Sequence, residues 1–96
     1  MALHQLKTDP IPFQDVLDKD KTFEIRLNDR DFKVGDYLEL LETKYSTEEM
    51  LMSKKPLEYT GRYIQATITH MLQNYQGLRD GWCILSFRFV LSGKHV

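Results

Sequence analysis

Three segments of this 96-residue chain alternate apolar and polar residues, and this period of two constrains the fold more than any other feature. The segments are 22–27, 62–72 and 82–91. Because successive side chains of a strand point to opposite faces, each segment is predicted to form a strand with one apolar face. Segments 3–7 and 37–43 predict two further strands. Strands of this length usually close into a small barrel or fold onto a helix, so we expect an α+β fold.

One helix is predicted early in the chain. Asp9 is a favourable N-cap residue and Pro10 suits the first helical position, so we expect a helix that stops near residues 18–20. The stretch 44–56 is ambiguous. It contains a sequence beginning at Ser46 that resembles a capped helix start, yet it can equally form a mobile flap or a surface for a protein partner.

The apolar faces of these elements define the predicted core. The predicted core residues are Leu6, Phe13, Val16, Leu17, Phe23, Ile25, Val34, Leu38, Leu40, Ile64, Ile68, Leu85, Phe87 and Phe89.

Composition limits the partners of the chain. It has 13 basic and 14 acidic residues, a net charge of −1, so we do not expect non-specific adhesion to nucleic acid or anionic lipid. The single Cys83 excludes an internal disulfide, and the three histidines are too dispersed to predict a metal site; no cofactor is expected. With no signal peptide or membrane-spanning run, residues 1–96 are expected to form one cytoplasmic domain.

A cluster of charged residues on the strand 22–27 is the strongest candidate for chemistry. Glu24 and Arg26 share its polar face, and Lys21 precedes it. A carboxylate that accepts from an amine, beside a guanidinium that donates to carbonyl or phosphate oxygens, suits a nucleobase or a phosphate. Alternating charges are also common on solvated strand faces, so the residues alone leave both interpretations open.

The segment Lys21-Thr22-Phe23-Glu24-Ile25-Arg26 resembles the K-x-x-E-x-R signature of ASCH domains, which belong to the PUA-like superfamily. The resemblance continues through residues 28–36 and 59–62 and covers about residues 3–90. It is closest to the small bacterial and phage ASCH proteins of unassigned function.

This resemblance implies a small, mixed, mainly antiparallel PUA-like β-barrel with one or two helices packed beside it. Lys21, Thr22, Glu24 and Arg26 would then line a cleft that binds single-stranded RNA or a nucleotide-like molecule. The chain departs from the family in having Lys19 where a glycine usually stands. Its stretch 44–56 also looks longer than in similar proteins.

A hydrolase acting on a modified nucleoside is the alternative that the resemblance raises. Some ASCH-like proteins deacetylate N4-acetylcytidine with a lysine and, three residues later, a threonine nucleophile. Lys21 is present here, but Glu24 occupies the threonine position, and Thr22 lies at a different offset. Lys21 and Glu24 would therefore have to act as an acid/base pair, and the sequence favours binding over catalysis.

Three further residues are candidates for the ligand site. Arg30 lies in the same charged cluster, His4 either joins the cleft or is a structural histidine, and Tyr75 is placed in a polar loop where it can stack on a base. Because the chain has no basic excess, a short single strand or a small ligand fits better than a duplex. An adaptor that binds a protein through 44–56 is a third possibility.

Overall fold

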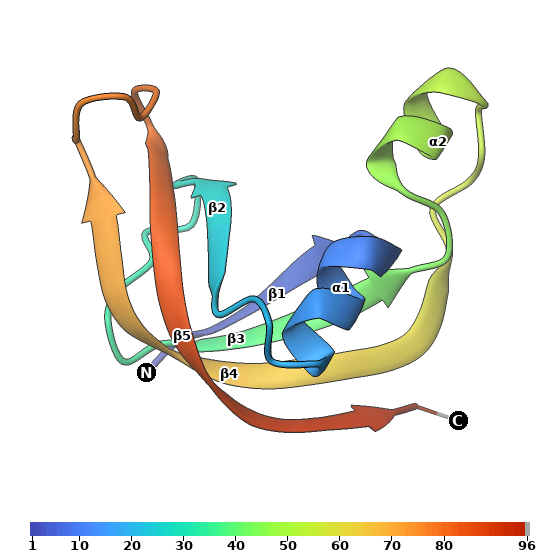
Figure 1. The fold of residues 1–96 in the computed structure, drawn as a ribbon, viewed down its shortest axis with the longest axis horizontal. Coiled ribbons are helices and arrows are strands. Elements are labelled where there is room, and N and C mark those ends of the chain that lie inside the picture. Colours follow the sequence, from blue (N-terminus) through green and yellow to red (C-terminus); the bar gives the residue numbers. More distant parts are fainter. Residues whose placement is uncertain (96) are drawn as a thin grey trace.

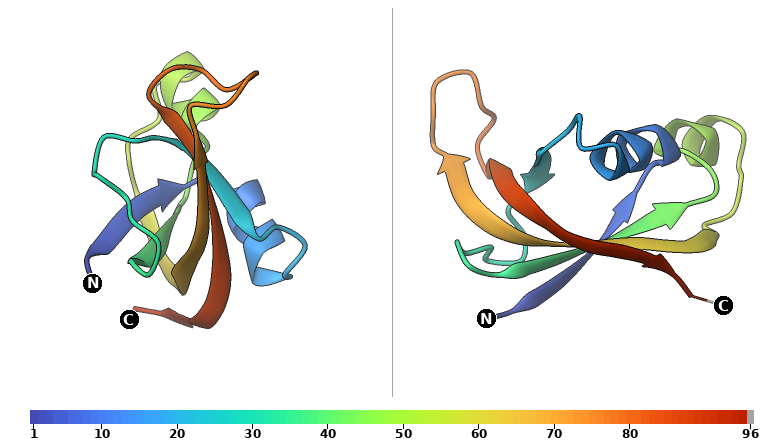
Figure 2. Two further views of the ribbon diagram at one scale, coloured as in Figure 1. Left: turned by 90° about the vertical axis from the view of Figure 1, so that its left-hand side faces the viewer. Right: turned by 60° about the horizontal axis from the view of Figure 1, so that its bottom comes forward.

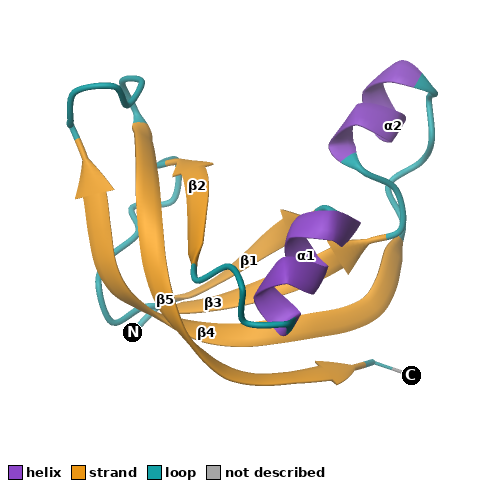
Figure 3. Cartoon of the chain, in the orientation of Figure 1, coloured by secondary structure: helices purple, strands orange, loops and turns teal. Residues whose placement is uncertain are grey.

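The computed structural model describes residues 1–95. It has an α+β fold with a five-stranded sheet and two short helices (Figures 1 and 3). In chain order the elements are β1 (Leu3–Thr8), α1 (Pro10–Leu17), β2 (Phe23–Leu27), β3 (Tyr37–Thr43), α2 (Thr47–Met52), β4 (Tyr59–Gln73) and β5 (Trp82–Lys94). The segments with a period of two are therefore strands, as predicted.

The sheet has the strand order β1-β3-β4-β5-β2. β1 pairs parallel with β3, and the other neighbours pair antiparallel. The sheet curls into a half-barrel because β4 and β5, its two longest strands, bend together (Figures 1 and 2). Their pairing shifts register between Gln65 and Ala66 and between Ile68 and His70, and such bulges increase strand bending. β1 and β2 are the two edges.

α1 lies against the concave face of the curled sheet (Figure 1). Phe13 and Val16, three residues apart on one side of the helix, are almost completely buried there. The remaining buried apolar residues are Leu6, Phe32, Leu38, Leu40, Ile64, Ala66, Ile68, Cys83, Leu85 and Phe87. The core thus lies between the helix and the inner face of the sheet.

α1 ends in a Schellman motif. The amide of Asp20 donates to the carbonyl of Asp15, and that of Lys19 donates to the carbonyl of Val16, both at 2.9 Å. Lys19 has a φ of 64°, the left-handed conformation in which glycine is favoured. The backbone therefore turns as it would with a glycine, although the side chain is a lysine.

The core prediction is wrong for three residues. Phe23 and Ile25 of β2 are 45% and 51% exposed, whereas Glu24 between them is buried. β2 therefore turns its charged side chains inward and its apolar side chains outward. Val34 lies in the loop before β3 and is 57% exposed. Leu17 and Phe89 are partly buried against the core rather than within it.

The ambiguous stretch 44–56 contains a helix with a complete capping box. The side chain of Ser46 accepts from the Glu49 amide, and the Glu49 side chain accepts from the Ser46 amide. α2 has no buried residue and stands away from the sheet (Figure 1). Of the two helices, only α1 packs into the core. Within residues 1–95, neither helix is long and apolar enough to cross a membrane.

Candidate functional site

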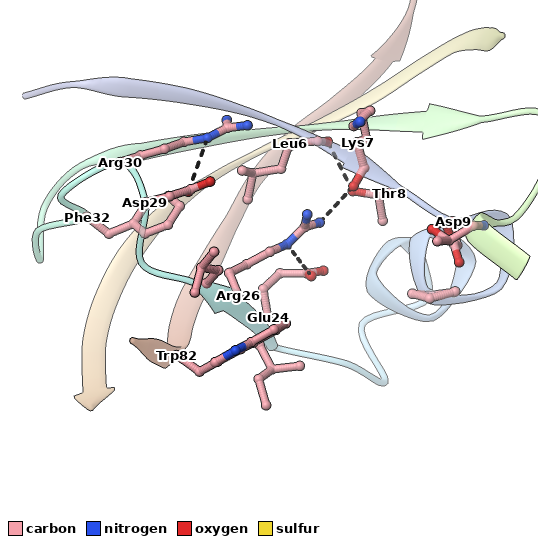
Figure 4. Close-up of a pocket in the computed structure, with 14 residues that line it drawn as sticks. Leu6, Lys7, Thr8, Asp9, Glu24, Arg26, Asp29, Arg30, Phe32 and Trp82 are labelled. Atoms are coloured by element: carbon pink, nitrogen blue, oxygen red, sulfur yellow. Dashed lines mark hydrogen bonds and ion pairs between the residues drawn. The ribbon is translucent and has the colours of Figure 1, made fainter. Parts of the chain in front are cut away.

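A cleft of about 400 Å³ opens between the two edges of the half-barrel. The end of β1, the inner side of β2 and the loop after β2 form its walls (Figure 4). Its lining residues are Leu6, Lys7, Thr8, Asp9, Pro12, Glu24, Ile25, Arg26, Leu27, Asp29, Arg30, Phe32, Thr47 and Trp82.

Glu24 is the buried charge of this cleft. The Lys21 Nζ lies 2.8 Å from its Oε1, and the Arg26 Nε lies 3.4 Å from its Oε2. The Glu24 side chain is only 7% exposed. A buried carboxylate without partners is strongly unfavourable, and one cation beside each oxygen offsets part of that penalty. The two cations also fix the direction of the carboxylate.

Two arginines connect the facing edges. Arg26 points from β2 toward β1 and donates through Nη2 to the carbonyl of Lys7 at 2.8 Å (Figure 4). Arg30 donates from the following loop to the carbonyl of Gln5. Because β1 is an edge strand, these carbonyls have no neighbouring strand to accept from. The guanidinium groups therefore bridge a gap that no strand pairing closes.

Backbone contacts position Arg30 and the inner face of β2. The amide of Asn28 donates to the carbonyl of Gly81 at 2.7 Å, which continues the pairing of β2 with β5. The side chain of Asn28 then accepts from the amide of Phe32, which closes the loop that carries Arg30.

The structure brings together only part of the predicted ligand set. Glu24, Arg26 and Arg30 line the cleft. Lys21 contacts Glu24 but lines a separate hollow with Thr22, against Phe87 and Phe89.

His4 and Tyr75 lie outside the cleft lining. Tyr75 is 64% exposed in the loop between β4 and β5. His4 is buried on β1, where its Nε2 is 2.8 Å from the Asp36 Oδ2. The hydrogen bond from His4 lowers the pKa of Asp36 below its ordinary value, and burial opposes this effect only in part.

Sequence reasoning missed several lining residues, of which Trp82 and Asp9 matter most. Trp82 is half-buried, and its side chain lies beside β2 in the cleft wall (Figure 4). Asp9 occupies the N-cap position of α1 without a side-chain capping bond. Its Oδ1 instead accepts from the backbone amide and the hydroxyl of Thr47, at 3.1 and 2.9 Å. No local sequence signal predicts this long-range contact.

A second ion pair lies away from the cleft. Glu42 on β3 is buried and accepts from the Arg62 Nε and Nη2 at 2.8 and 2.7 Å. The hydrogen bonds from Arg62 lower the pKa of Glu42, and those to Glu42 raise the pKa of Arg62. The guanidinium also covers the ring of Phe13, at 5.0 Å from its centroid. Arg62 is therefore a packing residue, whereas the neighbouring Glu58 contacts Lys44.

Within residues 1–95, no three His, Cys, Asp or Glu side chains lie close enough together to hold a metal ion. Burial raises the pKa of the Cys83 thiol, which is a core residue. The chemistry of the cleft is therefore that of carboxylates, guanidinium groups, one ammonium group, hydroxyls and one indole.

Comparison with protein families decides the classification. A model described as a domain of unknown function, DUF3850, matches residues 3–87. The chain belongs to the DUF3850 family. The match spans all of β1 to β4 and the first half of β5, so it contains every residue that lines the cleft of this DUF3850 domain. Comparison with curated proteins finds no match.

Proposed function

We propose that this DUF3850 domain is an ASCH-type, PUA-like domain whose cleft binds single-stranded RNA or a nucleotide-like molecule. The observation that carries the proposal is the buried Glu24, held between Lys21 and Arg26 at a cleft between two sheet edges. The resemblance of residues 21–26 to the ASCH signature and the curled mixed sheet both agree with it.

The lining of the cleft suits a base joined to a phosphate. Each Glu24 oxygen has one cation partner and keeps lone-pair capacity to accept from an exocyclic amine. Trp82 offers a partly exposed indole for stacking, worth about 1–3 kcal/mol per base. Lys7 and Arg30 supply positive charge for a phosphate.

Charge balance favours a small ligand. Three cationic residues, Lys7, Arg26 and Arg30, and three acidic ones, Asp9, Glu24 and Asp29, line the cleft. A surface that coats long RNA normally carries a clear basic excess. We therefore expect a nucleotide or a short, specific single strand.

The test is an amide-shift NMR titration of the labelled domain with nucleotides and short single-stranded RNA. We expect saturable shifts at Glu24, Arg26 and Arg30, and an affinity lower by about 1–3 kcal/mol in Arg26→Ala, because a charge-assisted contact is lost. Arg88→Ala is the matched control, since Arg88 is exposed on β5 and does not line the cleft. Unchanged affinity in Arg26→Ala would contradict the proposal that the ligand binds in the cleft.

A nucleoside hydrolase is the second candidate, and the 2.8 Å contact of Lys21 with Glu24 favours it. A lysine and a carboxylate in direct contact can exchange a proton and act as an acid/base pair. Thr22 is exposed and faces another hollow, so it offers no nucleophile beside Glu24. The assay is release of cytidine from N4-acetylcytidine. Turnover that disappears in a folded Glu24→Gln variant supports this function, and absence of turnover in the unmodified domain excludes it for this substrate.

A further inference from the structure

A second hollow adjoins the cleft, and Arg30 lines both. This hollow has a volume of about 450 Å³ and lies at the start of β1. His4, Asp36 and Lys33 are among its other lining residues. Arg30 therefore lies between the cleft and the hollow that His4 lines.

The His4–Asp36 pair fixes one nitrogen of the imidazole. The Asp36 carboxylate also accepts from the backbone amides of Ala2 and Lys33, at 3.2 and 3.1 Å. An ionised carboxylate only accepts hydrogen bonds, so His4 Nε2 must carry the hydrogen of their 2.8 Å contact. In the neutral ring Nδ1 is then the acceptor. The edge contact with Phe32, 4.7 Å between ring centroids, helps to hold the ring in place.

The other nitrogen remains available to a ligand. Within residues 1–95, the His4 side chain forms its hydrogen bond through Nε2. In the same part of the chain, no fully buried side-chain nitrogen or oxygen lacks a partner. His4 Nδ1 is therefore not a fully buried atom without a partner, and His4 is one of the residues that line the second hollow.

We propose that this second hollow binds the ribose of a nucleotide whose base lies in the cleft, with His4 Nδ1 accepting a hydrogen bond from the 2′-hydroxyl. This inference rests on the proposed function and adds selectivity for RNA over DNA. Arg30, between the two hollows, is placed to contact the phosphate attached to the sugar. A deoxyribose leaves the imidazole acceptor unpaired, and the 2′-hydroxyl is the group that distinguishes RNA from DNA.

The experiment compares matched ribo- and 2′-deoxyribo-oligonucleotides of one sequence by NMR titration. We expect the ribo form to bind about 3–10-fold more tightly, the effect of one hydrogen bond. In His4→Phe, which keeps an aromatic ring beside Phe32, the two forms should bind equally. His70→Phe is the control, because His70 is exposed on β4 and lines neither hollow. It should keep the preference.

A measurement on the unmodified protein makes the test independent of variant folding. The ¹⁵N resonance of His4 Nδ1 should shift on addition of the ribo-oligonucleotide and stay unchanged with the deoxy form. Equal affinities and equal shifts for the two forms would overturn the ribose assignment and leave the cleft proposal intact. Absence of binding by either form and by free nucleotides overturns both.

Discussion

Lys19 is a residue with a side chain whose backbone adopts a conformation that favours glycine. Its φ of 64° completes the Schellman turn after α1, and a left-handed conformation costs a residue with a Cβ roughly 1–2 kcal/mol. The Lys19 Nζ lies 4.5 Å from the centroid of the Phe89 ring, a cation–π contact that offsets part of this cost. The turn places Lys21 within reach of Glu24.

We therefore predict that Lys19→Gly is more stable than Lys19→Ala by about 1 kcal/mol. Both variants lose the contact with Phe89, so the comparison isolates the backbone conformation. Urea unfolding of the two variants measures the difference. Equal free energies of unfolding would show that position 19 is not strained.

Glu24 also shows the limit of sequence-based prediction at the scale of single residues. Alternation correctly separates Glu24 and Arg26 from Phe23 and Ile25, but it does not say which face is inward. The prediction placed the apolar face in the core. β2 is an edge strand whose inner face borders the cleft, and ion pairs make burial of the charged face tolerable. Pairing of this kind depends on tertiary neighbours, so the local pattern does not contain it.

Among the elements, α2 depends most on contacts outside itself. It has six residues and none is buried, and a helix this short is marginal in water without tertiary support. Its capping box supplies local support, and the contact of Thr47 with Asp9 ties it to the start of α1. The negative charge of Asp9 beside the first turn of α2 is also electrostatically favourable.

Asp9→Ala is expected to loosen α2 without unfolding the sheet. Loss of the hydrogen bonds to Thr47 should lower the local stability by about 0.5–1.5 kcal/mol. Hydrogen exchange should then accelerate several-fold at the amides of Met50 and Ser53, and stay unchanged in β4. The control is Asp15→Ala, a change on the exposed side of α1. Unchanged exchange at Met50 would show that Asp9 does not hold α2.

The positions and types of the elements were the most predictable feature of this chain, although β4 and β5 are longer than predicted. The strands followed from alternation, α1 from Asp9 and Pro10, and the α2 alternative from the capping box at Ser46. The parallel pairing of β1 with β3 and the gap between β1 and β2 were not visible, because both depend on how distant segments meet. The wall formed by Trp82 and Asp9 was missed for the same reason.

For the whole molecule, two buried carboxylates link stability to pH. The folded pKa values of Asp36 and Glu42 are lowered from their ordinary values of 3.8 and 4.5 by hydrogen bonds from His4 and Arg62. Their contribution to stability is complete above these ordinary values. Below them the unfolded chain takes up protons before the folded chain does, so this contribution disappears as the pH falls further.

We predict that the free energy of unfolding declines as the pH is lowered below about 4.5, and that Glu42→Gln flattens this decline while lowering stability at neutral pH. Urea unfolding between neutral pH and about pH 3 measures both effects. Glu58→Gln is the control, since Glu58 is exposed and pairs with Lys44 at 3.6 Å. A wild-type slope retained in Glu42→Gln would assign the acid sensitivity to other groups.

The two arginines that bridge β1 and β2 have a consequence for how separate molecules meet. An exposed sheet edge is a template onto which a strand from another chain can add, the first step toward fibrillar aggregation. On β1, the carbonyls of Gln5 and Lys7 that such a strand would need are already occupied by Arg30 and Arg26. The half-barrel thus protects an open edge with side chains, where a closed barrel would have used another strand.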